Sequence, residues 1–493
     1  MQQESTYLSL KRSKVLFLIF GLIVAVISSY AAFAIDGIAP LILAILAIGV
    51  VYVVFLFRNP RIGLTSVIIY CFTLGFFGRE VGGLQYGLFI EVFLILTWIA
   101  SLLYFKKEDW SVIKNDLSAA YLAWFIFSFL QVINPAGANP IGWLMEIRSE
   151  ALYPLLIIPL GFMLIKNYKD LDFIIKMLLL MALIAALNGI KQIHIGMFPG
   201  EQAFIDGPGG KTHLIFGKLR AFSFYDAGQF GGFEAVFITM AIVLALGSSH
   251  LWKKILLFAM AGTYGYAMLL SGTRGAFFAL VVAAFVAIFL TKNFKILILG
   301  GVFMVMFLGV LKFTSLGSGI YSIQRFRTSL DPNDPSLNVR FGTQRVLREY
   351  MSTRPFGGGL GVLGAYSELN KDKFLSTVQP DSFWVKIWAM TGIVGLTLWF
   401  GMIMYLLGKC SGIIWKIKDP KLKVKLIAML SSAAGIFFCS YGNEVINNMP
   451  ASLIFCISLV LVYIGPAIDR EISDKKNLLP ADAVTASTEL KLI

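Results

Sequence analysis

Residues 255–291 have the sequence ILLFAMAGTYGYAMLLSGTRGAFFALVVAAFVAIFLT. Two apolar runs, 255–271 and 275–291, are separated by a turn of only a few residues that contains Arg274. Each run is about as long as an α-helix must be to cross a bilayer, roughly 17–25 residues. The stretch therefore predicts two antiparallel membrane-spanning helices.

Apolar runs of this kind recur along the chain from Val15 to Gly465. Of the 493 residues, 58% are hydrophobic and 14% are charged, whereas soluble proteins have about 25% charged residues. We expect an all-α polytopic membrane protein with about fourteen transmembrane helices, and at least about twelve. The expected spans are 15–33, 38–57, 63–78, 87–104, 117–134, 149–166, 171–189, 229–247, 255–271, 275–291, 296–313, 383–408, 426–441 and 451–467. The short spans 63–78 and 426–441 are also compatible with re-entrant segments.

The distribution of basic residues predicts the orientation. Lys11, Arg12 and Lys14 precede the first run, and basic residues recur in every second connection. Such connections are cytoplasmic by the positive-inside rule. The expected parts are a cytoplasmic tail 1–14, a helical bundle 15–313 with a polar loop near 190–228, a large polar loop 314–382, C-terminal helices 383–467 and a cytoplasmic tail 468–493. Both polar loops then lie on the trans side. A cleavable signal ending at Ala32-Phe33-Ala34 is the less favoured alternative for the first run.

Several classes of function are disfavoured by composition. The net charge of +14 comes from basic residues at the ends of apolar runs rather than from one basic stripe, so we expect no nucleic-acid partner. The chain has three histidines and four cysteines, without zinc-ligand spacing or a nucleotide-binding fingerprint. We expect no metal and no cofactor, and therefore a substrate that is already activated.

Arginines on the trans side are the main candidates for a binding site. Arg274 lies in a short trans-side turn, where the positive-inside rule disfavours a basic residue. Arg220 lies just before the expected span 229–247, on the same side. The large loop adds Arg340 and Arg348. A guanidinium fork matches phosphate oxygens, so these arginines could hold a diphosphate at the membrane surface. The alternatives are snorkelling side chains, an anchor beside an aromatic belt, and surface charges on a loop helix.

The large loop also contains a predicted helix and a glycine-rich run. Residues 333–354 form a plausible amphipathic helix that stops near Pro355. The run Pro355-Phe-Gly-Gly-Gly-Leu-Gly361 would allow backbone to approach a ligand closely, or would act as a hinge. Asp381 is the candidate base, although an aspartate at a helix start is more often a cap.

Three stretches resemble the O-antigen polymerase and O-antigen ligase family of bacterial membrane glycosyltransferases. They are Ser271-Gly-Thr-Arg274-Gly275; Arg340-Phe-Gly-Thr-Gln-Arg-Val-Leu-Arg-Glu-Tyr-Met with Pro355–Gly361; and Pro380-Asp-Ser-Phe-Trp through Gly392-Ile-Val-Gly395-Leu. The resemblance implies a GT-C-like bundle in the bacterial inner membrane, with its active site facing the periplasm, that uses polyprenyl-diphosphate-linked sugars without a metal. Arg220, Arg274 and Arg340 correspond to the family's functional arginines.

The resemblance favours the polymerase branch. The ligase branch typically has a histidine in the large loop, and no histidine follows His250. The expected reaction transfers a glycan from undecaprenyl diphosphate to a hydroxyl of another lipid-linked repeat unit, for O-antigen, capsule or exopolysaccharide. A chain-length regulator and a flippase are possible partners. The alternatives are an O-antigen ligase or protein O-oligosaccharyltransferase, a flippase for lipid-linked oligosaccharide, and a scaffold for polysaccharide assembly.

Overall fold

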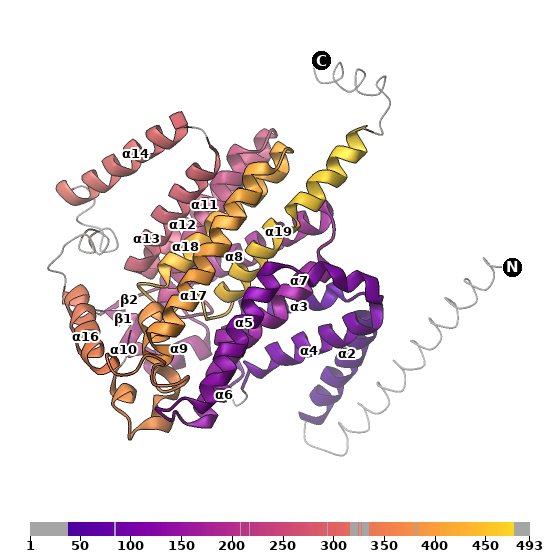
Figure 1. Cartoon of the computed structure of the whole chain (residues 1–493). Helices are drawn as coiled ribbons and strands as arrows, with labels where there is room; N and C mark the ends of the chain where they lie inside the picture. The colour runs from indigo at the N-terminus through magenta and orange to yellow at the C-terminus, as the bar shows by residue number, and fades with distance from the viewer. Residues whose placement is uncertain are drawn as a thin grey trace. The chain divides into compact units, whose positions relative to one another are not determined.

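The computed structural model describes residues 38–82, 85–207, 209–215, 217–292, 294–315, 324, 327, 335–378, 380 and 382–477. The helices in these ranges (Figure 1) are α2 (Ile38–Arg58), α3 (Arg61–Glu80), α4 (Leu88–Tyr104), α5 (Asp116–Leu130), α6 (Pro140–Ile147), α7 (Tyr153–Leu164), α8 (Tyr168–His194), α9 (Pro199–Asp206), α10 (Gly210–His213), α11 (Ala227–Leu246), α12 (Leu251–Ser271), α13 (Arg274–Leu290), α14 (Phe294–Phe313), α16 (Pro335–Met351), α17 (Phe383–Lys416), α18 (Pro420–Cys439) and α19 (Ala451–Asn477). Short 3₁₀ or π segments are η1 (Lys107–Ile113), η2 (Gln131–Ile133), η3 (Arg148–Leu152), η4 (Gly364–Asn370) and η5 (Phe374–Thr377).

The strands described are β1 (Leu214–Ile215) and β2 (Lys218–Leu219), which pair antiparallel in a small hairpin. The chain forms two units. One holds the described residues up to Gly63 together with Ile95–Lys106, and the other holds Leu64–Leu94 and the described residues from Lys107 onward. The candidate site, the cavity and the polar loops discussed below belong to the second unit.

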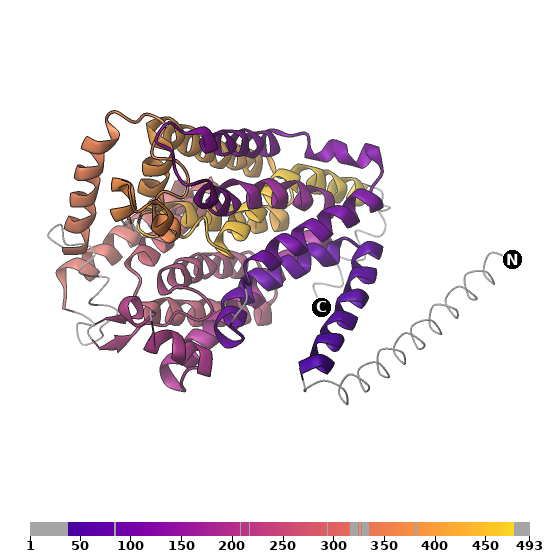
Figure 2. The ribbon, with the colours of Figure 1, turned by 90° about the horizontal axis from the view of Figure 1, so that it is seen from below.

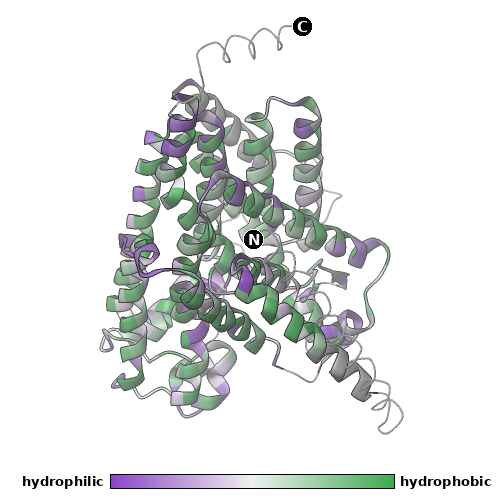
Figure 3. Ribbon diagram, turned by 90° about the vertical axis from the view of Figure 1, so that its right-hand side faces the viewer, coloured by the Kyte–Doolittle hydropathy of each residue, from purple (hydrophilic) through white to green (hydrophobic). Residues whose placement is uncertain are grey.

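The all-α polytopic fold class is confirmed. Nine helical segments within the described ranges are long and apolar enough to cross a membrane, and three shorter apolar helices accompany them. Every expected span from 38–57 onward coincides with a helix, whereas the first expected span, 15–33, lies outside the described residues. The two short expected spans belong to α3 and α18, which are 20 residues long each. Their length favours spanning helices over re-entrant segments. Most of the helices consist mainly of hydrophobic residues, whereas hydrophilic residues gather in the connections and near the helix ends (Figure 3).

The centre of the second unit is formed by α11, α13 and α18, which pack against one another, with α12 beside α11 (Figure 1). Small residues make this close approach possible. A Cβ at Gly435 of α18 would touch Ala279 and Ala283 of α13, and one at Gly232 of α11 would touch Cys439. About 78% of the apolar window of α11 is buried, against 28% for α12. Most outward side chains of α12 are thus available to lipid.

The C-terminal helix α19 packs against α18, α17 and α7 (Figure 2). Most of its side chains from Ala451 to Val462 are fully buried. This helix therefore joins the central group to α7.

The glycine-rich run after α16 contacts other backbone rather than leaving room for a ligand. The amides of Gly358 and Gly359 donate to the carbonyls of Ala389 and Met390, 2.9 Å each. These carbonyls lie where α17 is broken at Gly392, whose φ is 71°. The chain approaches so closely that a Cβ at Gly357 or Gly392 would collide with the opposite backbone. The predicted helix before this run is present as α16.

Candidate functional site

Arg220 leaves the hairpin of the 190–228 loop and reaches the α12–α13 turn. Its Nε donates to the carbonyl of Ser271 at 2.8 Å, and its Nη2 donates to Oγ1 of Thr273 at 2.9 Å. The backbone is also tied here, because the amide of Ala221 donates to the carbonyl of Leu270 at 3.0 Å. The loop and the turn are therefore held together by both main chain and side chain.

The α12–α13 turn is tight because Gly272 adopts a left-handed conformation, with φ of 56° and ψ of 26°, and ends α12. Thr273 is the residue before the first turn of α13, and Arg274 is the first residue of that helix. The Thr273 hydroxyl also donates to the carbonyl of Ala227 at the start of α11, 2.6 Å away. Arg274 is thus presented where α11 and α13 both begin.

A second turn, residues 441–450 between α18 and α19, packs against the starts of α11 and α13. A Cβ at Gly275 would collide with the Asn443 amide, and one at Gly228 would also touch Asn443. Arg340 of α16 donates from Nη2 to the carbonyl of Gly442 at 3.0 Å. The large loop therefore reaches the start of α13 through the 441–450 turn.

Arg220, Arg274 and Arg340 thus come from three separate segments and are brought together around the start of α13. All three side chains are partly buried. Two helices, α11 and α13, also begin here, and the first amides of a helix carry partial positive charge. An anion with several oxygen atoms, such as a diphosphate, is the ligand that such a group of donors suits best.

Residues 255–400 match the O-antigen ligase family. This match confirms the resemblance to the O-antigen ligase and polymerase family, and it does not distinguish the two branches. It covers Arg274, Arg340 and the break in α17, and it supports a membrane glycosyltransferase of this general type. None of the curated proteins compared with the chain matches it.

The other two residues predicted for the site, Arg348 and Asp381, are not among the arginines around the start of α13. Arg348 is exposed on α16, about 12 Å along the helix axis from Arg340. Asp381 lies outside the described residues. The cap expected of it is instead its neighbour Ser382, whose Oγ accepts from the amide of Val385 at 3.4 Å. Within the described residues, no group of three or more metal-type ligands occurs.

A buried charge cluster, which was not among the candidates expected from the sequence, lies between α6, α17 and the 441–450 turn. Lys386 of α17 is 4% exposed, and its Nζ lies 2.9 Å from carboxylate oxygens of both Glu146 and Glu444. Glu150, one helical turn after Glu146, is also buried. Lys386 and Glu150 lie within the expected spans 383–408 and 149–166, so their unusual position was visible in the sequence, but their pairing was not.

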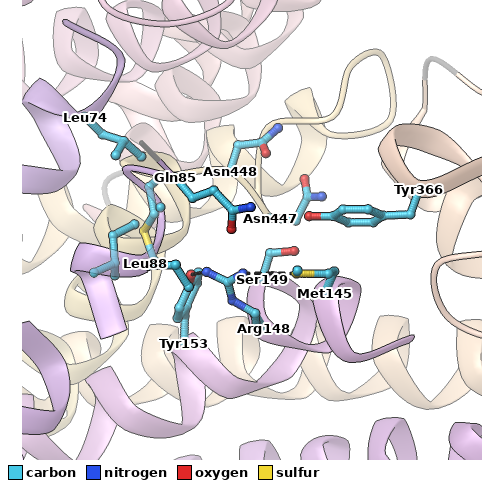
Figure 4. Close-up of a pocket in the computed structure, with 13 residues that line it drawn as sticks. Leu74, Gln85, Leu88, Met145, Arg148, Ser149, Tyr153, Tyr366, Asn447 and Asn448 are labelled. Atoms are coloured by element: carbon cyan, nitrogen blue, oxygen red, sulfur yellow. Dashed lines mark hydrogen bonds between the residues drawn. The ribbon is translucent and has the colours of Figure 1, made fainter. Parts of the chain in front are cut away.

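Next to this cluster is a cavity of about 500 Å³ (Figure 4). Its floor carries Arg148 and Tyr153, and both side chains donate to Oε1 of Glu91, at 2.5 and 2.7 Å. Glu91 is therefore a partly buried carboxylate that pairs with Arg148 and Tyr153. Asn447 and Asn448 of the 441–450 turn and Tyr366 of η4 line the opposite side. Burial and the nearby carboxylate of Glu146 raise the pKa of the Tyr366 hydroxyl, which stays a hydrogen-bond donor.

The 190–228 loop is held by its own buried contacts. The Arg79 guanidinium of α3 donates to the carbonyls of Ser223, at 2.8 Å, and Tyr225. Glu201 of α9 accepts from Asn188 at 2.9 Å and from Gln192 at 2.8 Å. His213 is buried, which lowers the pKa of its imidazole, although Asp226 opposes that shift. These contacts fix the segment that carries Arg220.

Proposed function

We propose that this protein is a polysaccharide polymerase of the inner membrane. It transfers a glycan from undecaprenyl diphosphate to a hydroxyl of another lipid-linked repeat unit on the periplasmic side. The observation that carries this proposal is the convergence of Arg220, Arg274 and Arg340 at the start of α13.

The chemistry requires a stabilised leaving group. When the bond from the anomeric carbon to the diphosphate breaks, negative charge grows on the phosphate oxygens. Preorganised guanidinium groups and helix amides stabilise this growing charge, so they lower the free energy of the transition state more than that of the bound substrate. Arg220 and Arg274 would hold the diphosphate, and Arg340 would assist from the large loop. Arg348 is a further candidate for substrate contact, from an exposed position on α16.

The acceptor hydroxyl must lose its proton as it attacks the anomeric carbon. Asp381 is the proposed general base, and a direct displacement would invert the anomeric centre. The polymerase branch is favoured over the ligase branch because the large loop contains no histidine. An O-antigen ligase or a protein O-oligosaccharyltransferase is the alternative within the same reaction class.

A flippase for lipid-linked oligosaccharide is the candidate from another class. It is favoured by the Lys386 cluster, because charged side chains within spans are typical of transport pathways. Here, however, Lys386 is paired with Glu146 and Glu444. A scaffold role, by contrast, predicts that replacement of the arginines has no effect.

The deciding experiment gives purified protein lipid-linked repeat units and sizes the products on a gel. Wild type should make a ladder of longer glycans, and Arg274→Ala should lose it. Arg345→Ala is the matched control, because Arg345 is exposed on the same helix as Arg340. Movement of substrate across vesicles without any ladder would instead support the flippase. A normal ladder from Arg274→Ala would exclude the proposed role of the arginines.

A further inference from the structure

The cavity beside the Lys386 cluster has a lining of mixed apolar and polar side chains, and among the described residues this lining is nearly neutral. Arg148 is its cation, and the Glu91 carboxylate compensates that charge at 2.5 Å. The remaining polar groups are amides and hydroxyls from Gln85, Ser149, Asn447, Asn448 and the tyrosines 153 and 366, and apolar side chains complete the wall. The compensated charge of Arg148 does not favour an anion, and a lipid tail would leave the amides and hydroxyls of the lining without hydrogen bonds. It suits a neutral molecule with many hydroxyl groups.

One amide in the cavity has unused hydrogen-bonding capacity. Asn447 is 6% exposed, and its Oδ1 is buried without a hydrogen-bond partner among the described residues. A buried polar atom of this kind is unfavourable unless a ligand or water satisfies it. In Figure 4 the polar ends of Asn447, Gln85 and Tyr366 point toward the same space above Arg148 and Ser149. They offer both donors and acceptors to one ligand.

The 441–450 turn connects this cavity to the arginine site. Its first part contacts the arginine site, where Gly442 accepts from Arg340. Its middle is fixed by Glu444, which pairs with Lys386 at 2.9 Å. Its last part, from Asn447 to Met449, lines the cavity, and Met449 also accepts from Gln229 of α11 at 2.5 Å. A molecule in the cavity and a diphosphate at the arginines would therefore contact the same short turn.

We propose that the cavity binds a neutral saccharide unit of a lipid-linked substrate. The volume of about 500 Å³ is in the range of small-ligand sites, about 300–1,000 Å³. Gln85 and Asn448 are exposed at its rim, so a glycan can enter from the trans side. The identity of the saccharide as a repeat unit rests on the proposed function. The presence of a saccharide site does not.

The test uses a variant that fills the cavity. A Cβ at Gly87 would lie 3.8 Å from the Arg148 guanidinium, an ordinary contact, so the larger side chain of Gly87→Phe would enter the cavity. Gly262→Phe is the control, because a Cβ at Gly262 on exposed α12 meets nothing within 4 Å. Asn447→Ala and Gln85→Ala are milder variants that do not depend on Gly87→Phe folding. Gln202→Ala, an exposed amide on α9, is the control for Gln85→Ala.

Binding is measured on the full chain in detergent, by saturation-transfer NMR with the repeat-unit oligosaccharide released from its carrier by mild acid. Wild type, Arg274→Ala and both controls should bind it. Gly87→Phe should lose binding, and Asn447→Ala should weaken it roughly tenfold, the effect of about 1.4 kcal/mol. Unchanged binding by Gly87→Phe and Asn447→Ala, or no binding by wild type, overturns the proposal.

The source of the saccharide is identified in the ladder assay. If the cavity holds the acceptor, Asn447→Ala raises the acceptor KM roughly tenfold and leaves kcat near wild type. If it holds the sugar of the donor, the donor KM rises instead. Loss of the ladder in Arg274→Ala with unchanged KM values in Asn447→Ala leaves the polymerase proposal standing and removes the saccharide site. Saccharide binding by wild type without any ladder would instead leave the saccharide site standing and remove the polymerase proposal.

Discussion

Thr273, the residue before Arg274, holds Arg220 at the proposed diphosphate site. Its hydroxyl accepts from Arg220 and donates to the carbonyl of Ala227, so it orients the guanidinium and ties it to α11. Thr273→Val keeps the shape and removes both hydrogen bonds. A hydrogen bond to a charged group contributes about 1.5–3 kcal/mol, so we expect polymerising activity to fall roughly 10- to 100-fold. Thr273→Ser keeps the hydroxyl and should retain most activity in the same gel assay. Equal activity of the two variants would show that this link is unimportant.

Lys386 is the cation of the buried cluster, with Glu146 and Glu444 each 2.9 Å away. Removal of one partner leaves buried charge uncompensated, at a cost of about 3–5 kcal/mol. Lys386→Met should therefore strongly lower the unfolding temperature of the purified protein. The double variant Lys386→Met/Glu146→Gln removes charge from both sides and should recover part of the loss. A double variant less stable than the single one would contradict this account.

Sequence patterns predicted some of these residues and not others. Arg274 was visible because a cation in a short trans-side turn contradicts the orientation bias. The Lys386 pairing was not visible, because its partners come from α6 and from the turn after α18. A hydropathy window averages over such isolated charges, and periodicity does not indicate which distant side chains meet.

Among the elements, α17 depends on one glycine. Gly392 has a φ of 71°, and a Cβ there would collide with the carbonyl of Pro355. Its ψ of −172° places it in a backbone region that essentially only glycine adopts, so Gly392→Ala should destabilise the protein by about 1–3 kcal/mol from the backbone conformation alone. Gly401→Ala, on the same helix with open space around it, should be neutral or stabilising by up to about 1 kcal/mol. Thermal unfolding in detergent distinguishes them, and similar values for the two variants would argue against a fixed break.

The 190–228 loop should be sensitive to acid through His213. Its Nδ1 faces the carbonyl of Gly209 at 2.9 Å and its Nε2 faces the amide of Ala227 at 3.3 Å, which suits a neutral imidazole. Burial lowers its pKa in the folded protein, so the unfolded chain takes up the proton more readily. The contribution of His213 to the free energy of unfolding is therefore fully present above the ordinary pKa of about 6.5, and it is lost as the pH falls below that value.

The measurement is the unfolding temperature between pH 8 and pH 5. Wild type should lose more stability on acidification than His213→Gln, which has no imidazole to protonate. The Asp226 carboxylate, 3.5 Å from Nε2, opposes the shift, while Arg220 and Arg79 strengthen it. Asp226→Asn should therefore make the acid loss steeper. Identical profiles for wild type and His213→Gln would exclude His213 as the cause.

Helix positions were predicted better than helix interruptions. Spans such as 255–271 and 275–291 correspond closely to α12 and α13, because apolar length alone determines them. The break in α17 falls within an apolar run, and hydropathy does not report a backbone angle. The glycine-rich run was expected to approach a ligand, but it approaches the backbone at that break. The sequence indicated a close approach without indicating its partner.

At the scale of the whole molecule, the orientation of the chain is a prediction from charge alone. The positive-inside rule places both polar loops on the trans side and the connection around Lys169 in the cytoplasm. The arginine site and the cavity both lie at the helix ends that this rule predicts to be trans, so the proposed function depends on this orientation. An active site facing the cytoplasm would not meet a glycan that has already been moved across the membrane.

Single cysteines test the orientation directly. The four native cysteines are all buried, which should keep their reaction with an impermeant maleimide low. Gln202→Cys in the first polar loop and Glu368→Cys in the large loop are at exposed positions and should react in intact spheroplasts. Lys169→Cys is also at an exposed position, but it should react only after the membrane is permeabilised. Labelling of Lys169→Cys in intact spheroplasts, with protection of the two loop positions, would invert the molecule and remove the basis for a periplasmic site.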